Sequence, residues 1–562
     1  MDHFSGLIKI VLVGLFFSCV LQLQAQDITN LVKKEPFKFS GNLSMGGSMF
    51  RTSQNLNDRS PLSYYVQGNS TFSFYGFKVP VTLSFRDSRL NFSKQINRIG
   101  IRPKYKWAQI YFGANRYQFS PYTLSGQNIN GIGVQLTPGN FRFTAMRGTM
   151  QNLLPQVDSL VYGTALIPIY QRKAFGTKLG YNSSKGDIEL MLFKAKDQLD
   201  PPVAIVDTLR DILTPEENIV VGLKAQTTIA SNFTVGMNIA GSVFTNDQTN
   251  DSVTIEKTYQ ELAQKTLTPT SSTFFSYAGD AFARLQLKGI TLGFKIKQVE
   301  PLYKSLGLFY IQNDYRNITL NTRFSLFERK LTIGATYGTQ QNNLRELRLL
   351  TNERNIKSIQ VNYNSGKVFS LSTNYSNFAQ DQSAGLVNVE DTLRYAQVSK
   401  NLTVVPRLSF ISGDKTQNIT LSLVQFALDD LSAFYTEPRN TKSRIASVSY
   451  GIKWKSSGLG IKFGGNYNTT ESFVSSSNRY GGTLGVSKKL DKKARISLSS
   501  TYNLRSNNGI SSGTVLNTKL AISYTPQKRQ RLSLNIGNLR RSFELKENRN
   551  DIRANASYNV SF

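Results

Sequence analysis

The chain has 562 residues, of which 40% are hydrophobic and 18% are charged, and its formal net charge at pH 7 is +31. Its mean hydropathy of −0.29 is too low for a membrane protein built of helices. The only cysteine, Cys19, and the only histidine, His3, lie near the N-terminus. A Ser-His-Asp triad or a zinc centre is therefore excluded from the rest of the chain, because each needs an imidazole or a thiolate. No acidic calcium loop, phosphate-binding glycine motif or activated Ser or Thr is evident, so we expect neither a cofactor or metal nor an enzymatic activity.

The N-terminus carries the one strongly apolar stretch, residues 7–23, followed by Leu-Gln-Ala before Gln26. This pattern predicts a signal peptide over residues 1–25 that is cleaved on export, and a short periplasmic segment over residues 26–36. An uncleaved N-terminal helix is disfavoured because the stretch is shorter than the roughly 20 residues that a membrane span needs. Processing as a lipoprotein at Cys19 is also disfavoured, since a further apolar run and a better cleavage site follow it.

The rest of the chain is organised by a two-residue period. Stretches that alternate apolar and polar residues recur along it, and the clearest are residues 79–85, 318–326, 448–454, 494–504, 516–524 and 552–562. Such stretches are strands with one apolar and one polar face, and no helical period competes over them.

The connections between these strands alternate in length. Short polar turns are predicted at residues 75–78, 137–140, 183–187, 288–289, 328–330, 364–367, 456–458, 491–493 and 526–529. Longer loops are predicted at residues 51–61, 150–170, 196–216, 245–271, 299–313, 340–352, 378–391, 429–440, 469–478, 505–513 and 541–550. Short periplasmic turns and long extracellular loops are typical of outer-membrane barrels. The sequence therefore predicts an all-β fold, a single large antiparallel transmembrane β-barrel over residues 37–562 with about 24 strands, within a range of about 22 to 26.

One region does not fit a strict pairing of strands. Between residues 86 and 128 lies a strand-like run, Tyr105 to Phe112, with long connections on both sides and no evident partner. One interpretation places part of residues 86–128 in the lumen, where irregular backbone is tolerated at membrane depth. The other interpretation is a missed strand among residues 88–101.

The loop at residues 245–271 contains four apolar residues with roughly helical spacing, Ile255, Tyr259, Leu262 and Leu267. They are compatible with a short amphipathic helix. Such a helix would dock a partner, constrict the pore or pack on the loops.

The C-terminus ends in alternating apolar residues, Tyr558, Val560 and the terminal Phe562. This ending resembles the signal by which Gram-negative outer-membrane proteins engage their barrel-assembly machinery. Together with the cleavage site and the strands rich in Tyr and Asn, the chain resembles a porin-like outer-membrane barrel of the Bacteroidota type. The resemblance implies that the protein resides in the outer membrane, with its lipid and the assembly machinery as partners, and it assigns no further functional residues.

The excess of 67 Lys and Arg over 36 Asp and Glu is spread over turns and alternate strand positions. No helix or compact unit collects it, so binding to nucleic acid is disfavoured. Candidate basic residues on the polar strand face, and hence lining the lumen, are Arg323, Lys453, Arg495, Lys519 and Arg553. Inward-pointing charges of this kind attract anions and predict an anion-preferring pore. The alternative is that many of them pair with carboxylates or meet lipid headgroups.

Two functions follow from this pattern. The first is a channel or porin-like transporter for small anionic solutes. The second is a non-conducting accessory or structural barrel of a secretion or surface-assembly complex, whose loops hold a partner protein. An energised receptor is disfavoured, because the first predicted strand, residues 37–50, begins only about ten residues after the cleavage site and leaves no room for a plug domain.

Overall fold

The computed structural model describes residues 36–53, 61–86, 98–152, 170–199, 214–253, 267, 269–366, 368–384, 396–432, 439–491, 493–544 and 547–562. The predicted signal peptide, nearly all of the predicted periplasmic segment and the loop residues Ile255, Tyr259 and Leu262 lie outside these ranges. No residue that the structure describes belongs to a helix long and apolar enough to cross a membrane.

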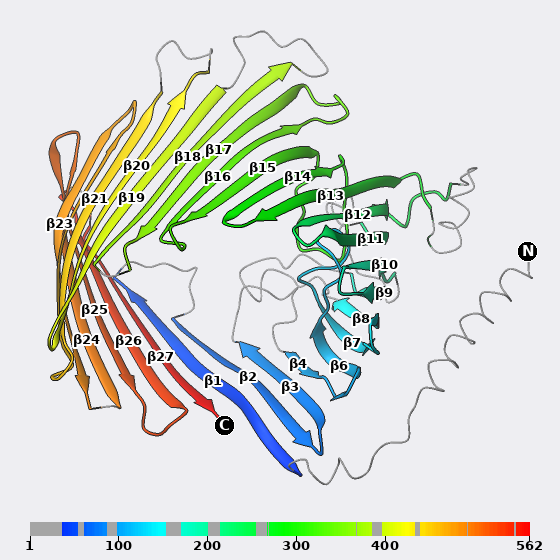
Figure 1. The fold of residues 1–562 in the computed structure, drawn as a ribbon, viewed down its shortest axis with the longest axis horizontal. Coiled ribbons are helices and arrows are strands. Elements are labelled where there is room, and N and C mark those ends of the chain that lie inside the picture. Colours follow the sequence, from blue (N-terminus) through cyan, green and yellow to red (C-terminus); the bar gives the residue numbers. More distant parts are fainter. Residues whose placement is uncertain are drawn as a thin grey trace, which may run out of the picture.

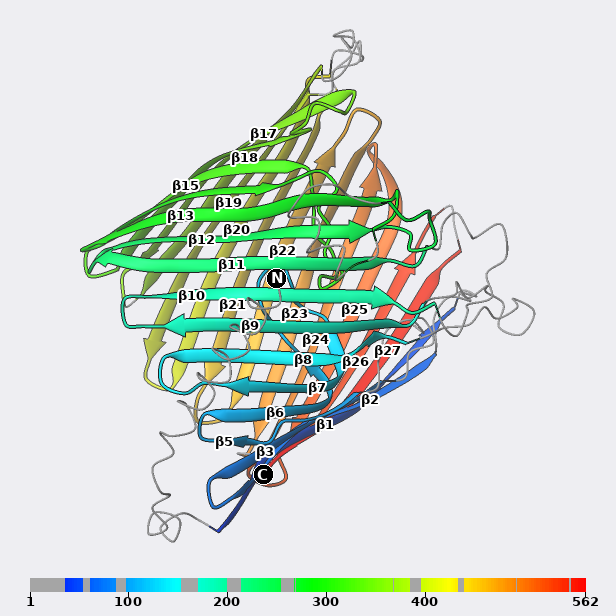
Figure 2. The same cartoon turned by 90° about the vertical axis from the view of Figure 1, so that its right-hand side faces the viewer.

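The described chain folds into one antiparallel sheet. Its strands are β1 (Phe37–Thr52), β2 (Leu62–Phe74), β3 (Phe77–Arg86), β4 (Arg98–Ile101), β5 (Lys104–Tyr105), β6 (Ala108–Arg116), β7 (Asn128–Leu136), β8 (Phe141–Gln151), β9 (Arg172–Asn182), β10 (Gly186–Asp197), β11 (Glu217–Ala230), β12 (Phe233–Thr245), β13 (Thr273–Leu287), β14 (Ile290–Val299), β15 (Tyr315–Leu326), β16 (Leu331–Asn342), β17 (Leu350–Asn364), β18 (Phe369–Ala384), β19 (Ala396–Ser412), β20 (Lys415–Asp430), β21 (Thr441–Trp454), β22 (Leu459–Glu471), β23 (Ser476–Leu490), β24 (Ala494–Asn507), β25 (Ile510–Tyr524), β26 (Gln530–Ser542) and β27 (Arg549–Ser561). Strands that follow one another in the chain lie side by side, as Figure 2 shows for β6 to β13.

The sheet closes on itself, because β1 pairs with β27 as well as with β2. The ring of strands is seen in Figure 1. β4 and β5 are two pieces of one interrupted strand, since β3 and β6 each pair with both of them. The 27 strands therefore occupy 26 positions around a closed barrel. This number lies at the upper end of the predicted range and leaves no open strand edge in the described sheet.

The structure places the region before β7 partly in the wall and partly inside the ring (Figure 1). The run Tyr105 to Phe112 lies in the wall, as the second residue of β5, a two-residue turn and the first five residues of β6, so this run does not enter the lumen. Residues 108–112 of this run pair with β7, and Phe112 also pairs with Ile101 of the missed strand β4, which is only four residues long and too short to show a period. The part of this region that leaves the wall is residues 117–127, which follow β6.

The connections differ from the prediction at several places. The loops predicted over residues 469–478 and 505–513 are tight turns, because β22 and β23 together extend over all but residues 472–475, and β24 and β25 over all but residues 508–509. Turns at residues 231–232 and 413–414 were missed altogether. Gly, Asn and Ser, which favour loops, occur in this chain within long strands, where cross-strand pairing overrides local preference.

The C-terminus lies at the seam of the barrel. Phe562 and Gly41 exchange two backbone hydrogen bonds of 3.0 Å, and the Phe562 ring stacks on Phe39 with a centroid distance of 4.3 Å. Tyr558 and Val560 lie in β27, opposite residues of β1. The residues of the predicted assembly signal therefore take part in closing the ring.

Candidate functional site

The inner face of the barrel is identified by burial. In β10, Leu190 and Ile188 are 54% and 51% exposed, whereas Met191, Phe193 and Ala195 are buried. Since successive side chains point to opposite faces, one face of this strand is covered and the other is open. The cover consists of residues 117–127 and 300–314, called here the lumenal segments, which lie inside the ring in Figure 1. The buried face is therefore the inner one.

The two lumenal segments are bonded to each other. The Tyr303 hydroxyl donates to the carbonyl of Tyr122 at 2.8 Å, and the Ser305 hydroxyl donates to the carbonyl of Thr123 at 2.6 Å. Both tyrosines are almost fully buried, and burial raises the pKa of each phenol. The phenols are therefore neutral hydrogen-bond donors at any physiological pH.

The lumenal segments are also bonded to the wall. The Tyr122 hydroxyl donates to Asp280 of β13 at 2.6 Å, and the backbone N–H of Leu306 donates to Asn218 of β11 at 3.1 Å. Around these bonds lies an apolar core of buried side chains from β7 to β15 and from both segments. The segments therefore form a fixed inner layer on this part of the wall.

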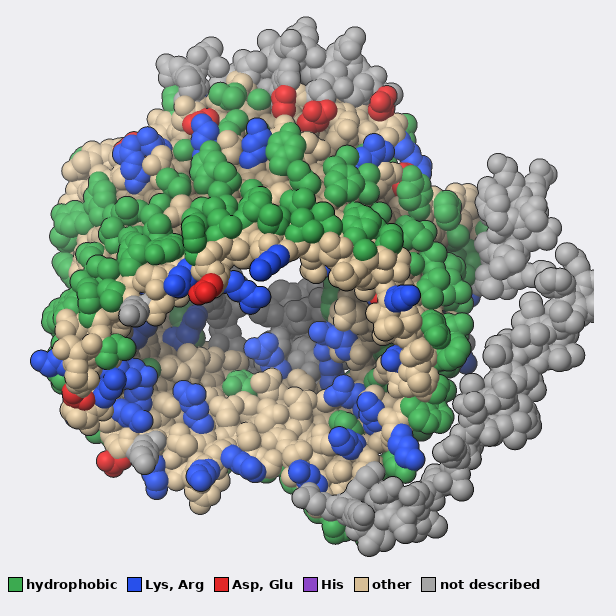
Figure 3. Space-filling view, in the orientation of Figure 1, with side chains coloured by type: hydrophobic (Ala, Val, Ile, Leu, Met, Phe, Trp, Pro, Cys, Tyr) green, Lys and Arg blue, Asp and Glu red, His purple; other side chains and the backbone are tan. Residues whose placement is uncertain are grey.

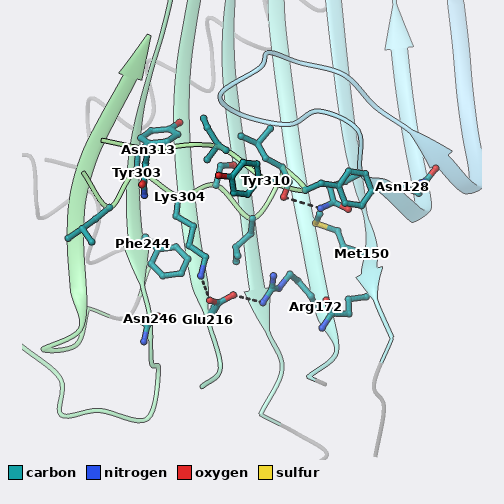
Figure 4. Close-up of a pocket in the computed structure, with 18 of the residues that line it drawn as sticks. Asn128, Met150, Arg172, Glu216, Phe244, Asn246, Tyr303, Lys304, Tyr310 and Asn313 are labelled. Atoms are coloured by element: carbon teal, nitrogen blue, oxygen red, sulfur yellow. Dashed lines mark hydrogen bonds and ion pairs between the residues drawn. The ribbon is translucent and has the colours of Figure 1, made fainter. Parts of the chain in front are cut away.

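A chain of ion pairs ties the second lumenal segment to the ends of three strands. Lys304 pairs with Glu216, which also accepts from Arg172 at 2.7 Å, and Arg172 contacts Asp197 at 2.7 Å (Figure 4). Asp197 is 2% exposed, so its charge requires this partner.

A cavity of about 640 Å³ lies beside the second lumenal segment, as Figure 4 shows. Leu302, Phe309 and Tyr310 line it and are exposed, Tyr310 by 83%. The lumenal layer thus presents apolar side chains to the open part of the barrel.

The five basic residues selected from the sequence all lie in the wall. Arg323 is in β15, Lys453 in β21, Arg495 in β24, Lys519 in β25 and Arg553 in β27. All five side chains are exposed, and none of them forms an ion pair with another residue that the structure describes. In its strand, each of the five has the parity opposite to that of the outward apolar side chains, so each belongs to the inner face.

Two of these five lie near one another. Lys519 and Arg553 are both register partners of Gly537, so they stand in one row, two strand spacings or about 10 Å apart. The Arg553 guanidinium also lies 5.7 Å from the centre of the Phe50 ring. The structure does not bring the other three together.

Charge compensation differs between the two parts of the inner wall. In β9 to β14, basic side chains face carboxylates: Lys178 with Glu189 at 3.4 Å, Lys224 with Asp187 at 2.7 Å, and Lys295 with Asp280 at 3.2 Å. On the inner face of β15 to β27, the ion pairs that the described residues form all involve Asp551. Figure 3 looks into the opening, which is lined by Lys and Arg with few carboxylates, while hydrophobic side chains cover the outside.

A second cavity, of about 600 Å³, lies in this basic part of the wall between β21 and β26. Arg479, Arg505 and Arg541 line it. The predicted loop at residues 505–513 included Arg505, and the predicted loop at residues 469–478 ended immediately before Arg479, so neither arginine was assigned to a strand. Tyr480 and Tyr502 point outward and are exposed, and Arg479 and Arg505 have the opposite parity in the same two strands. This alternation was the signal that would have placed both arginines on the inner face.

No protein-family model and no curated protein sequence matches the chain. Solved structures that match the chain include the P pilus usher PapC translocation pore, at 11% identity and a TM-score of 0.37, covering 93% of this chain and 99% of that one. The outer membrane protein OpdK from Pseudomonas aeruginosa has 14% identity and a TM-score of 0.29, covering 63% and 95%. The FrpB iron transporter from Neisseria meningitidis has 12% identity and a TM-score of 0.40, covering 95% and 82%. At these values we assign no family, and the class of the protein is given by its own architecture, a large closed antiparallel β-barrel with a layered lumen.

Proposed function

We propose that the chain is an outer-membrane channel of porin-like type whose lumen passes small anionic solutes. A closed sheet satisfies all of its backbone hydrogen bonds internally and can therefore reside in lipid. The outward side chains are apolar and exposed, as at Leu190, Phe294 and Leu484, which suits contact with acyl chains.

The observation that carries the proposal is the uncompensated positive charge on the inner face of β15 to β27. A passage bounded by low-dielectric walls and lined by one sign of charge raises the local concentration of the opposite ion. Carboxylates pair with Lys178, Lys224 and Lys295 in β9 to β14, whereas the inner face of β15 to β27 has ion pairs only at Asp551 among the described residues.

The test is single-channel recording of the purified full chain in a planar bilayer under a salt gradient. The reversal potential is expected to show a preference for chloride over potassium. Changing both Lys519→Glu and Arg553→Glu reverses two charges in one row and is expected to reduce that preference strongly. The control, Lys288→Glu, makes the same change in the exposed β13–β14 turn and is expected to have a much smaller effect. A cation preference in the unmodified protein would overturn the proposal.

The lumenal segments favour a second candidate, a non-conducting accessory barrel, because they cover a large part of the inner wall with a packed layer. The same recordings distinguish the two. Stable conductance supports the channel, and a silent bilayer together with a protein partner that co-purifies in mild detergent supports the accessory barrel.

A further inference from the structure

The cavity between β21 and β26 differs from the rest of the basic wall in its construction. Arg479 of β23 and Arg505 of β24 are direct register partners, so their Cα atoms are about 5 Å apart. Like charges placed opposite one another destabilise a sheet. Neither arginine forms an ion pair within the part of the chain that the structure describes. Two guanidinium groups are therefore held side by side without a carboxylate.

The backbone next to Arg505 is also irregular. Arg505 pairs with Gly513 and the next residue, Ser506, pairs with Ser511, so β25 contains an extra residue at this point. Gly513 has φ +118°, and a Cβ there would lie 1.9 Å from the carbonyl oxygen of Ser542. Only glycine fits this close approach. A bulge of this kind re-aims the side chain opposite it, here Arg505.

A further polar group in the cavity has no partner. Asn468 is the register partner of Arg479, and its Oδ1 atom is buried without a hydrogen bond among the described residues. Nearby, the Nδ2 atom of Asn466 donates to Oδ1 of Asn503 at 2.9 Å across Gly481, the residue between them on β23. Asn466 and Asn503 are thus held by a hydrogen bond to each other, whereas the side-chain oxygen of Asn468 still lacks a donor among the described residues.

Apolar side chains line the same cavity on both flanks of the two arginines. Ile445 of β21 lies on one flank, and Val515 of β25 and Leu539 of β26 lie on the other, all three at inward positions of their strands. The outward apolar positions of these strands have the opposite parity, for example Val448 and Leu516. Aliphatic side chains on an otherwise polar face favour a ligand with an apolar body.

We propose that this cavity, named here the arginine pocket (Arg479, Arg505, Ile445, Val515 and Leu539), is a binding site for a small organic monocarboxylate. Arg479 and Arg505 hold the carboxylate, because the planar guanidinium matches its two oxygens. Val515, which lies on the strand next to Arg505 and pairs with Asn503, contacts a short hydrocarbon chain. Inorganic phosphate is polar on every side and uses only half of this lining. The inference rests on the proposed function in one respect, that the pocket lies on the route of the transported anion.

The test is calorimetric titration of the purified full chain in detergent with sodium butyrate, with inorganic phosphate and butylammonium as comparison probes. Butyrate is expected to bind more tightly than phosphate, and butylammonium not at all. Arg505→Gln is expected to weaken butyrate binding about 10- to 100-fold, because a hydrogen bond to a charged partner is lost. Arg505→Lys keeps the charge but not the fork and is expected to give an intermediate loss.

The matched control is Arg495→Gln, which removes the same group from the same face of the same strand, about 33 Å away. It is expected to leave butyrate binding unchanged. Equal losses in Arg495→Gln and Arg505→Gln, no binding of butyrate, or phosphate binding as tight as butyrate would each overturn the assignment.

Conductance measured on the same preparations separates the two proposals. If the protein binds butyrate through Arg505 but passes no ions, the binding-site proposal stands and the channel proposal is refuted. If the protein conducts anions and the Arg505→Gln variant binds butyrate as well as the unmodified protein does, the channel proposal stands and the binding-site proposal is refuted.

Discussion

The two lumenal segments approach each other closely at Gly307, and enlarging this residue tests whether they form a fixed layer. A Cβ at this position would lie 2.3 Å from the carbonyl oxygen of Thr123, 3.1 Å from Cα of Leu124 and 3.0 Å from the Phe193 ring. Ordinary contacts of a Cβ begin at 3.4 Å, so Gly307→Ala forces the segments apart by about 1 Å. The backbone hydrogen bond from Ser125 to Gly307, 3.0 Å long, is then lost or weakened.

The expected cost combines two effects. Overpacking of a closely packed site costs about 1–3 kcal/mol, and a lost hydrogen bond about 1 kcal/mol. The sum, about 2–4 kcal/mol, falls on the opening of the lumenal segments and not on the barrel, because no strand ladder includes Gly307. Amide exchange in residues 117–127 and 300–314 is therefore expected to become about 30- to 1000-fold faster, with exchange in the strands unchanged.

Hydrogen–deuterium exchange with mass spectrometry measures this directly, and the bilayer recordings supply a second readout, since a detached layer raises the conductance. Gly537→Ala is the control: it adds the same methyl group to the inner face of β26, where no atom lies within 4 Å of the new Cβ. If Gly307→Ala and Gly537→Ala exchange alike and conduct alike, the lumenal segments are not the tightly packed layer inferred from their contacts.

Three further outcomes are expected. Tyr303→Phe leaves the buried Tyr122 carbonyl without its donor and is expected to destabilise the lumenal segments by about 1–3 kcal/mol, seen as faster amide exchange confined to them; unchanged exchange would contradict the role of this bond. Phe562→Ala removes a ring stacked at the seam and is expected to cost the barrel at least about 0.5–1.5 kcal/mol, seen as a lower temperature for the loss of the compact form on gels; no change would mean that the stack does not support closure. Asp551→Asn releases Arg541 and Arg549 from their shared carboxylate and is expected to shift the reversal potential toward stronger anion preference; a shift toward cations would contradict the electrostatic argument.

The strand faces could be predicted because the period of two is a direct record of which side of a strand is covered. The interrupted strand β4–β5 could not, since two pieces of four and two residues carry too little pattern. The ends of β24 and β25 were missed for another reason. Their Asn, Gly and Ser residues, such as Asn507 and Gly513, favour turns when considered locally, and only pairing with neighbours keeps them in the sheet.

The lumenal layer left a signal in the sequence that the two-residue period does not detect. Residues 190–193 of β10 read Leu-Met-Leu-Phe, apolar on both faces. A strand of this kind is covered on both sides. In an outer-membrane barrel, an inward apolar run therefore predicts that something packs inside, here residues 300–314, although it does not identify which connection supplies the cover.

The basic inner wall is not required by the fold. A slip of one residue would exchange the two faces of a strand, so the outward apolar positions fix the register and leave the inward positions free to vary. In β10 the free positions were filled with apolar side chains that hold the lumenal segments, whereas in β23 and β24 they were filled with Arg479 and Arg505, which oppose one another without a counter-charge. Repulsion between the two guanidinium groups lowers the stability of the sheet, and the pair provides no packing contact in return. The presence of this arginine pair is therefore best explained by a ligand, and an anion is the one class of ligand that removes the repulsion when it binds.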